Sequence, residues 1–442
     1  MLDEDEAAAL DALLVGRAVE PVYQPIVDLV GGDVVGVEAL IRGPADGPFT
    51  RPDAMFAAAR RVGRLAELDM LCRGRAVEEA FSAGMRGPLA LFVNVEPLTV
   101  ATELVPFTAT SDLAERGVRV VAELTERDLT ADPARLFSFA DQVRAHGFHV
   151  ALDDVGAHPA SLALMPFLRP EVVKLDLRLV HARPGPEVAE IMSAVAAYAE
   201  HSEALVLAEG VETRDHLATA RSLGATLGQG WWFGPAQPAQ AILPGLRAPR
   251  LVPPWRRPAA RVPRGSPFAT VARVRTPRRA TAPLLLSVSR FLERQAAEMG
   301  ELAVVVAAFQ RASSFTGDER RRYSDLARSA AFVGVLGVGM PAEPEPGVRG
   351  ADLAAGDPVC REWDIAVIGP HFAAALVARD LDDPTGPAGA DPDRAFDYVL
   401  THDRPLVLDV ARSLLARTVP QAGRDTVGSP DSPVRVVSVG ES

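Results

Sequence analysis

The residues His149–Asp176, with the sequence HVALDDVGAHPASLALMPFLRPEVVKLD, contain two short apolar segments from which the fold can be predicted. The segments HVAL and VVKL have the length and branching of buried parallel strands. The first is followed by the carboxylate pair Asp153–Asp154, and the second carries Lys174, with Asp176 two residues later. Because residues i and i+2 of a strand point to the same face, Lys174 and Asp176 are expected to share one side.

Lys174 is unusual in composition because it is the only lysine of the chain. The 46 basic residues are 45 arginines and this one lysine. Lysine offers a compact, titratable point charge, whereas arginine offers a broad fork that stays protonated. The composition therefore suggests that an ammonium group is needed at this position. A structural ion pair within a buried strand is the alternative that the composition leaves open.

The overall composition is that of an ordinary globular protein. The chain has 442 residues, 48% of them hydrophobic and 24% charged, which predicts two or three domains with ample core. A net charge of −12 argues against nucleic-acid binding as the main function. The two cysteines, Cys72 and Cys360, are too few and too far apart for a disulfide framework or a zinc site.

The N-terminal segment MLDEDEAAAL is acidic and lacks the basic and apolar regions of a signal peptide. The sequence contains no run of 18 or more apolar residues, so we expect no membrane span. These features predict a cytoplasmic protein in a reducing environment.

Apolar, strand-like segments alternate with amphipathic helical stretches through the first half of the chain. The predicted strands are residues 22–29, 34–41, 89–95, 118–125, 149–154, 172–177, 204–210 and 227–233. The clearest predicted helices are residues 52–82, 133–146, 186–201 and 213–223. Eight strands with intervening helices predict an α/β fold, a (β/α)8 barrel. The turn Gly31–Gly32 predicts a hairpin, so the first strand is expected to be antiparallel to the others.

Polar residues lie at or near the C-terminal ends of seven of these strands. They are Glu38, Asn94, Glu123, Asp153, Lys174, Glu209 and Gln229. Each alone could be a helix cap or a turn residue, but in a barrel the strand ends converge on the catalytic face. Carboxylate and amide oxygens suit Mg²⁺ or Mn²⁺, and the absence of His and Cys disfavours zinc. Adjacent aspartates would let one carboxylate bridge two ions, as two-metal phosphodiester hydrolysis requires.

Seven motifs in this order resemble the EAL-domain cyclic-di-GMP phosphodiesterases. They are EALIR (38–42), FVNV (92–95), ELTE (123–126), DD (153–154), VKLD (173–176), AEGVE (208–212) and GQGWWFG (228–234). The resemblance covers about residues 15–245. It implies a modified TIM barrel that converts cyclic di-GMP to linear pGpG with Mg²⁺ or Mn²⁺.

The resemblance also implies a role for each matched residue. A two-metal site would be formed by Glu38, Asn94, Glu123, Asp153 and Asp154. The attacking water would be oriented and deprotonated by Lys174 and Glu209. The substrate would be contacted by Gln24, Arg42, Asp176 and Gln229. Supporting acids would be Glu126 and Glu212. The family further implies a homodimer formed through the barrel.

The loop after the aspartate pair departs from the family pattern. The family usually has DDFGTGYSS, whereas this chain has DDVGAHPAS. Val155 replaces an aromatic residue, His158 replaces a glycine, and Pro159 restricts φ. The sequence therefore leaves two further hypotheses open: a receptor that binds cyclic di-GMP without cutting it and relays its occupancy to a protein partner, and a different metal-dependent barrel enzyme.

Residues 247–282 are rich in arginine and proline and are predicted to form a linker between the barrel, 1–246, and a second domain, 283–420. We expect a solvated spacer here rather than a nucleic-acid-binding segment. The tail, 421–442, is polar and predicted to be disordered.

The second domain is predicted to be α/β or α+β. Its motifs FQRASSF (309–315), EWDIAVIGP (362–370), LVARD (376–380) and THDRPLV (401–407) resemble the DICT domain, a sensory module. This implies an unidentified sensory ligand or protein partner. The His–Asp pair in THDR has no evident companion nucleophile, so Thr401 or Asp403 is expected to cap a helix. Trp363 and His402 are candidates for a ligand pocket, with core packing as the alternative.

Overall fold

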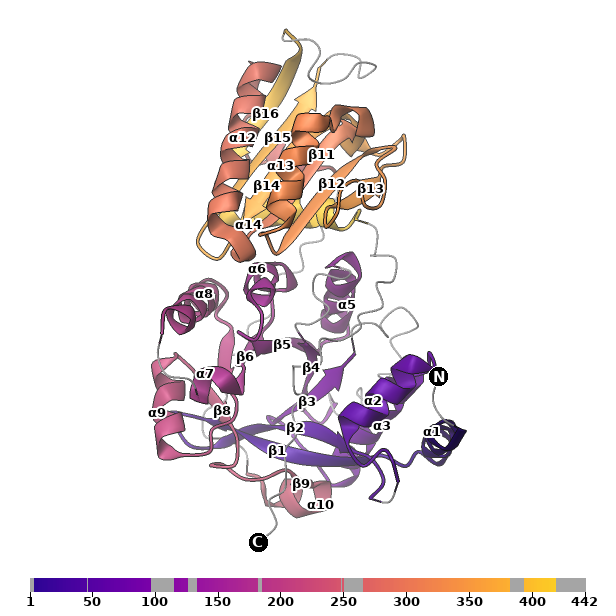
Figure 1. Cartoon of the computed structure of the whole chain (residues 1–442). Coiled ribbons are helices and arrows are strands. Elements are labelled where there is room, and N and C mark those ends of the chain that lie inside the picture. Colours follow the sequence, from indigo (N-terminus) through magenta and orange to yellow (C-terminus); the bar gives the residue numbers. More distant parts are fainter. Residues whose placement is uncertain are drawn as a thin grey trace.

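The computed structural model describes residues 4–45, 47–96, 115–125, 133–181, 185–247, 249, 265–381 and 393–418. The chain forms a barrel from its first half and a smaller sheet domain from its second (Figure 1). The second domain lies over the side of the barrel formed by α5, α6 and α8. None of the helices within the described ranges is both long and apolar enough to cross a membrane.

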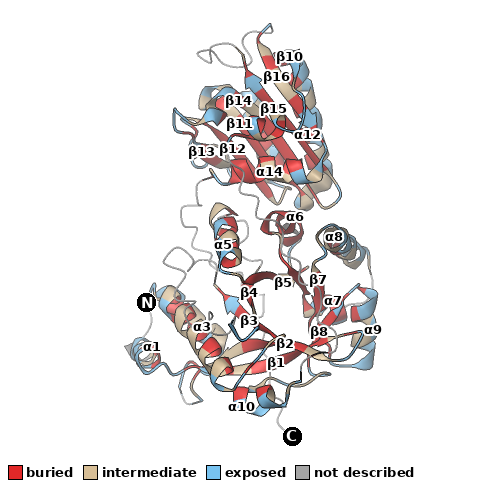
Figure 2. Ribbon diagram, turned by 180° about the vertical axis from the view of Figure 1, so that it is seen from behind, coloured by how far each residue is buried: buried red, intermediate tan, exposed pale blue. Residues whose placement is uncertain are grey.

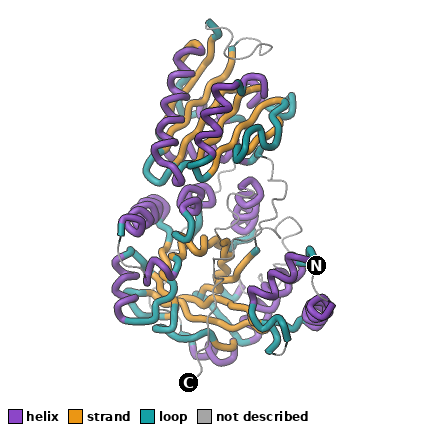
Figure 3. The backbone as a smooth tube through the Cα atoms, viewed as in Figure 1, coloured by secondary structure: helices purple, strands orange, loops and turns teal. Residues whose placement is uncertain are grey.

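Eight strands close into the barrel (Figure 3). They are β1 (Glu20–Asp28), β2 (Val34–Arg42), β3 (Ala90–Val95), β4 (Arg119–Thr125), β5 (His149–Val155), β6 (Val172–Leu175), β7 (Leu205–Ala208) and β8 (Leu227–Gln229). Strands β2 to β8 are parallel in chain order, and β1 closes the barrel by pairing antiparallel with both β2 and β8. A short strand, β9 (Gln237–Pro238), adds to β1. The predicted barrel and its antiparallel first strand are confirmed.

The barrel helices are α1 (Glu4–Gly16), α2 (Pro52–Arg61), α3 (Leu65–Ser82), α5 (Pro133–Ala145), α6 (Pro159–Leu168), α7 (Leu177–His181), α8 (Pro186–Ser202), α9 (Arg214–Ser222) and α10 (Ala239–Ile242). The single helix predicted for 52–82 is wrong, because the chain breaks at Gly63, where φ is +73°. Only glycine adopts this left-handed conformation without steric cost. The last predicted strand is also shorter than expected, since residues 231–233 form a turn.

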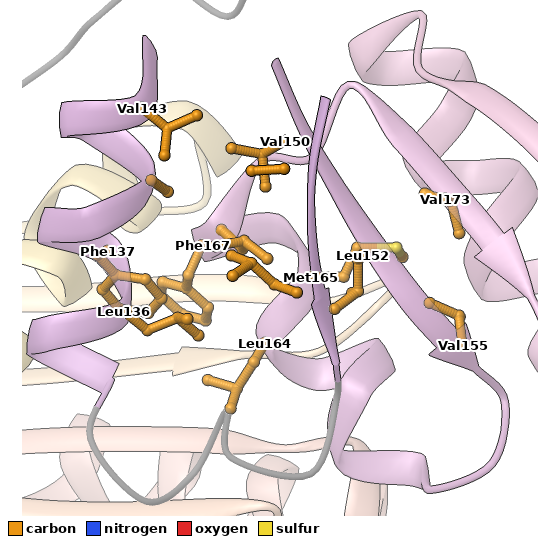
Figure 4. Packing of buried hydrophobic residues seen from close by; sticks show 14 of the residues in the cluster. Leu136, Phe137, Val143, Val150, Leu152, Val155, Leu164, Met165, Phe167 and Val173 are labelled. Carbon is orange, nitrogen blue, oxygen red and sulfur yellow. The ribbon is translucent and has the colours of Figure 1, made fainter. Parts of the chain in front are cut away.

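The outer faces of the barrel strands pack against the helices, and Figure 4 shows this layer around β5. Phe137 of α5 stacks on Phe167 of α6 with ring centroids 5.9 Å apart. Leu152 and Val150 of β5 lie in the same buried cluster. This packing fixes β5 and α6 relative to each other, and β5 carries Asp153 and Asp154 near its end.

The second domain is a seven-stranded sheet in the order β10-β16-β15-β14-β11-β12-β13. The strands are β10 (Arg278–Thr281), β11 (Val304–Arg311), β12 (Phe332–Val338), β13 (Arg349–Asp352), β14 (Glu362–Ile368), β15 (Ala373–Asp380) and β16 (Ala395–Thr401). Its helices are α11 (Pro267–Ala272), α12 (Ala282–Met299), α13 (Gly317–Ala327) and α14 (Arg404–Leu415). Helices α12 and α13 cover one face, and α11 and α14 pack on the other.

Part of the segment predicted as linker is structured. Helix α11 begins at Pro267, capped by the Ser266 hydroxyl, and β10 pairs with β16 at the edge of the second sheet. Residues 248 and 250–264, which hold much of the arginine- and proline-rich sequence, and the tail from 419 lie outside the described residues. The expected cap of α14 is confirmed, since the Asp403 carboxylate accepts the Leu406 backbone N–H.

Helix α14 also contacts the barrel helices α5 and α6, as the rear view shows (Figure 2). Arg412 is nearly buried at this contact. Its Nη2 donates to Asp141 Oδ2 at 2.7 Å, and its Nη1 donates to the carbonyl oxygen of Phe167 at 3.3 Å. A cation is favourable here because the last carbonyls of a helix carry partial negative charge.

Candidate active site

The polar residues of the site occupy one layer inside the barrel because side chains alternate along a strand. On six strands the polar residue lies two positions after an inward-facing apolar one: Phe92 and Asn94, Val121 and Glu123, Ala151 and Asp153, Val172 and Lys174, Leu207 and Glu209, Leu227 and Gln229. The apolar residues form the inner core of the barrel. The polar residues therefore lie above that core, at the face where the parallel strands end.

Lys174 is the centre of this layer, and its side chain is fully buried. Its Nζ lies 2.6 Å from Glu123 Oε1 and 3.0 Å from Glu209 Oε1. It also lies 3.1 Å from Asp153 Oδ1 and 3.6 Å from Glu38 Oε1. We call these five residues the lysine cluster. Four carboxylates thus share one ammonium group in a volume closed to solvent.

The charge imbalance shifts the pKa values of the cluster. Burial raises the pKa of Glu123 well above its usual value, and the nearby Glu38 carboxylate raises it further. Burial also raises the pKa of Asp153, to about 7, against the opposing effect of Lys174. Burial acts to lower the pKa of Lys174, but the surrounding carboxylates outweigh it and hold that pKa well above its usual value. Lys174 therefore remains an ammonium ion, while carboxylates of the cluster retain protons.

Side-chain amides orient Glu38 from two sides. Asn94 Nδ2 donates to Glu38 Oε1 at 3.2 Å, and Gln229 Nε2 donates to Glu38 Oε2. The same Gln229 nitrogen lies 3.0 Å from Gln24 Oε1, and Gln24 Nε2 donates to the Gly234 carbonyl oxygen. Strands β1, β2, β3 and β8 are thereby joined across the mouth of the barrel.

Asp154 reaches the site through a β-bulge. Successive strand residues normally point to opposite faces, yet the β5–β6 register shifts between Leu152 and Val155. Asp154 adopts φ +56° there, which is unusual for a residue other than glycine. As a result, carboxylate oxygens of Asp153, Asp154 and Glu209 lie within 4.8 Å of one another.

The lysine cluster fits a divalent cation. Glu123 is fully buried, and its Oε2 has no hydrogen-bond partner among the residues that the structure describes. Such an orphaned carboxylate oxygen is costly unless a cation or a proton satisfies it. The available donors are carboxylate and amide oxygens, which suit hard divalent ions. The predicted ligands Glu38, Asn94, Glu123, Asp153 and Asp154 would hold such ions.

Other predicted residues lie elsewhere. Asp176 follows the last residue of β6, and its Oδ1 accepts hydrogen bonds from the backbone N and Nε of Arg178. Asp176 is buried, and its backbone N–H donates to the Val155 carbonyl oxygen at 3.1 Å, so the hydrogen bonding between β5 and β6 continues to this residue. That Asp176 shares a face with Lys174 stays a prediction. Arg42 ends β2 and is half-buried, with its Nη1 donating to the Ile41 carbonyl oxygen.

Of the two predicted supporting acids, one lies apart from the lysine cluster and the other lies outside the described residues. Glu212 is exposed and groups with His181 and His216, with potential ligand atoms of the three within 4.8 Å of one another. Glu126 falls outside the described residues.

Gln229 is positioned by a close contact between the backbone at Gly230 and the backbone at Val211, which the sequence analysis did not predict. Gly230 has φ +147°, and a Cβ atom at this position would lie 2.3 Å from the Val211 carbonyl oxygen. The Val211 N–H donates to the Gln229 carbonyl oxygen at 2.9 Å. Only glycine allows the chain after β7 to come this close, and the GQG sequence is the signal that indicates it.

The fold and the site together place the chain in a class of proteins: (β/α)8 barrels with a candidate cation site formed by buried carboxylates at the C-terminal ends of the strands. The family model described as "EAL domain" matches residues 7–236, about half of the chain, and the chain belongs to this family. A second model, described as "Sensory domain in DIguanylate Cyclases and Two-component system", or DICT, matches residues 269–381. Both resemblances found in the sequence are confirmed.

The curated relatives include two that are named for a reaction. "Probable cyclic di-GMP phosphodiesterase PdeB" of Escherichia coli K12 is 29% identical over 226 residues, 50% of this chain and 43% of that protein. "Cyclic di-GMP phosphodiesterase NbdA" of Pseudomonas aeruginosa is 30% identical over 244 residues, 53% of this chain and 31% of that protein. The chain thus spans less than half the length of these relatives.

Among solved structures, "PaMucR Phosphodiesterase, c-di-GMP complex" is 24% identical to the chain, with a TM-score of 0.47. The match covers 54% of this chain and 99% of that one.

Proposed function

We propose that the barrel hydrolyses cyclic di-GMP to linear pGpG with Mg²⁺ or Mn²⁺. The observation that carries the proposal is the lysine cluster, in which four buried carboxylates contact one ammonium group. The cluster has four acidic groups and only one basic group, so bound cations would balance its charge. Cations would also neutralise a phosphodiester anion. Two relatives named as cyclic di-GMP phosphodiesterases support the choice of substrate.

The residues of the cluster have different roles in the proposed hydrolysis. Bound divalent ions would polarise the phosphodiester and lower the pKa of a bound water. Glu209 accepts a proton from the attacking water, and the Lys174 ammonium, 3.0 Å from Glu209 Oε1, keeps that carboxylate oriented. The water oxygen bonds to phosphorus and one P–O ester bond breaks. The leaving oxygen becomes a hydroxyl by taking up the proton that Glu209 accepted. Gln24, Arg42 and Gln229 are proposed to contact the substrate, and Asp176 to do so after exchanging its Arg178 partner.

A second candidate function is a receptor that binds cyclic di-GMP without cutting it. The observation that favours it is the segment 153–161, where Asp154 has a positive φ and Pro159 begins α6 five residues later. Binding requires the pocket alone, whereas turnover also requires this segment to place Asp153 and Asp154 within a few tenths of an ångström.

We further propose that the DICT domain regulates the barrel. Its helix α14 contacts α6 through Arg412, and α6 is the helix that follows the aspartate pair. A change in α14 would therefore act on the element that leads out of the active site. The direction of regulation is a matter for measurement.

The test is pGpG formation by the full chain with Mg²⁺ or Mn²⁺, followed by chromatography. We expect Glu209→Gln and Lys174→Ala to abolish turnover while cyclic di-GMP still binds. Glu187→Gln, an exposed acid in the first turn of α8, is the matched control and should retain full activity. Binding without turnover in the unmodified chain would replace hydrolysis by the receptor hypothesis. Equal turnover in all variants would refute the assigned mechanism.

A further inference from the structure

The DICT domain encloses a cavity of about 420 Å³ on one face of its sheet. The cavity is lined by residues of α12, α13, β11 and β14. Figure 1 shows where these four elements lie in the second domain. Its volume is within the range of small-molecule sites in proteins. It is far from the lysine cluster in sequence and belongs to a different domain.

Aromatic rings form much of the cavity wall. Phe309 and Tyr323 meet edge to face with centroids 5.4 Å apart. Trp363 meets Phe396 in the same way at 5.8 Å, which fixes the indole at the cavity. Leu286 of α12 lies at the wall and is only half-buried. Fixed rings of this kind favour a flat, apolar partner that can lie against them or meet their edges.

Ser289 places a buried hydroxyl in the cavity wall. Ser289 is 6% exposed, and within the described part of the chain its Oγ has no hydrogen-bond partner. A buried hydroxyl that makes no hydrogen bond is destabilising, and it can act as both donor and acceptor. The Ser289 hydroxyl is therefore available to form a hydrogen bond with a ligand in the cavity.

The charged residues of the cavity balance one another. Arg322 Nε donates to Glu293 at 2.6 Å, and its Nη2 donates to Glu319 at 3.2 Å. Arg290 supplies a second positive charge, so Glu293 and Glu319 face two bases. A third acid of the wall, Asp364, is fully buried, and burial together with the nearby Glu362 raises its pKa well above its usual value, so it retains a proton and adds no charge. An ionic ligand would find no uncompensated counter-charge here, unlike in the barrel.

The strand that forms the cavity floor is also distorted. The β11–β12 register shifts between Ala308 and Arg311, and Gln310 adopts φ +59°. Gln310 lines the cavity and donates from Nε2 to Asp380 at 3.3 Å. Bulges with left-handed residues are concentrated at binding sites, where they redirect side chains.

We propose that this cavity binds a small, uncharged, planar aromatic molecule whose N–H or C=O group pairs with Ser289. The aromatic wall selects a flat ring, the balanced charges select a neutral molecule, and the unused hydroxyl selects one polar substituent. The proposal is independent of whether the barrel hydrolyses cyclic di-GMP.

The test is saturation-transfer NMR on the full chain with three neutral probes that carry an N–H or C=O group: indole, 2-quinolone and benzamide. We expect at least one to bind with a millimolar or lower Kd. The anionic analogue indole-3-carboxylate should bind at least tenfold more weakly than indole. If none of the probes binds the folded chain, or if the anion binds as well as indole, the proposal is wrong.

Two pairs of variants on α12 locate the binding. Leu286→Trp fills the cavity and should reduce affinity at least tenfold, whereas Leu284→Trp, at a residue that is 48% exposed and outside the cavity, should not change it.

Ser289→Ala should weaken binding about fivefold while leaving the free protein as stable or more stable, because it removes an unpaired buried hydroxyl. Ser287→Ala is its control, since the exposed Ser287 hydroxyl donates to the Pro283 carbonyl oxygen. Unchanged affinity in Leu286→Trp, or equal effects of the two serine variants, would overturn the proposal.

Discussion

The two domains each contain a buried charged cluster, and the clusters differ in charge balance. In the barrel, four carboxylates contact the single ammonium of Lys174. In the DICT domain, Arg394 pairs with Asp380, and Gln310 bonds to both residues. The second cluster balances one acid with one base and includes a neutral amide, as expected of a structural element. The first is balanced only when cations or protons are added, which is what distinguishes a binding site from a structural pair.

The largest expected effect tests the unbalanced cluster. Glu123→Gln should lower pGpG formation by roughly a thousandfold or more, because it removes a ligand of the proposed cation. Without metal, the free energy of unfolding should stay the same or increase, since the glutamine resembles the protonated form that burial favours. Turnover assays and denaturant titration in a chelator measure the two effects. A large loss of metal-free stability would show that the cluster is a structural ion pair.

The balanced pair should respond in the opposite way. Asp380→Asn removes the carboxylate charge that contacts the buried Arg394 guanidinium and should cost about 3 kcal/mol of folding stability. If the folded fraction is corrected for, pGpG formation should change less than twofold. Denaturant titration and the same turnover assay provide the measurement. A specific loss of turnover in the folded variant would mean that this pair belongs to the catalytic machinery.

The pH dependence of stability separates the clusters further. Asp153 has its pKa raised from 3.8 to about 7, so the native state binds a proton that the unfolded chain releases above pH 4. The resulting stabilisation is present below that pH and is lost as pH rises through about 7, by on the order of a few kcal/mol. Thermal melts in a chelator from pH 5 to 8 should show this decrease, and Mn²⁺ should reverse it.

Asp153→Asn is the matched variant for the pH experiment, because it cannot titrate. Its metal-free stability should depend less on pH than that of the unmodified chain, and Mn²⁺ should restore less stability. Parallel pH profiles for the two proteins would place the titrating group elsewhere.

The smallest expected effect concerns the contact between the domains. Arg412→Gln removes the charge that contacts Asp141 and the Phe167 carbonyl, and should cost about 1 to 2 kcal/mol. Calorimetry should show a broadened or split transition as the domains uncouple. Arg278→Gln, at an exposed residue of β10, is the control and should change neither quantity. A single unchanged transition in Arg412→Gln would indicate that other contacts hold the domains together.

The sequence predicted the parts of the site that follow from strand alternation. Glu123, Asp153 and Lys174 each lie on a regular strand, so the two-residue period placed them correctly on the inner face. Asp154 joined the site only through a bulge. This local exception leaves no periodic signal in the sequence.

Contacts between distant segments were likewise beyond prediction. The DICT cavity brings α12 next to β14, and Arg412 meets Asp141 across 271 positions of the chain. Trp363 was a candidate pocket residue and lines the cavity, whereas His402 lies against Phe372 instead. Amphipathic periodicity predicts that a helix packs, but it does not identify the surface it packs against.

Because the chain has a single lysine, amine-selective reagents can label the candidate active site at one residue. Amine-selective acylating reagents distinguish lysine from arginine, and Lys174 carries the only side-chain amine among 442 residues. Its side chain is fully buried in the closed barrel, and its protonated form is unreactive toward such reagents. Apart from the terminal amine, any acylation of the chain therefore reports that the barrel mouth has opened and that the ammonium has lost its proton. Peptide mass spectrometry could follow this opening at one residue without introducing a label elsewhere.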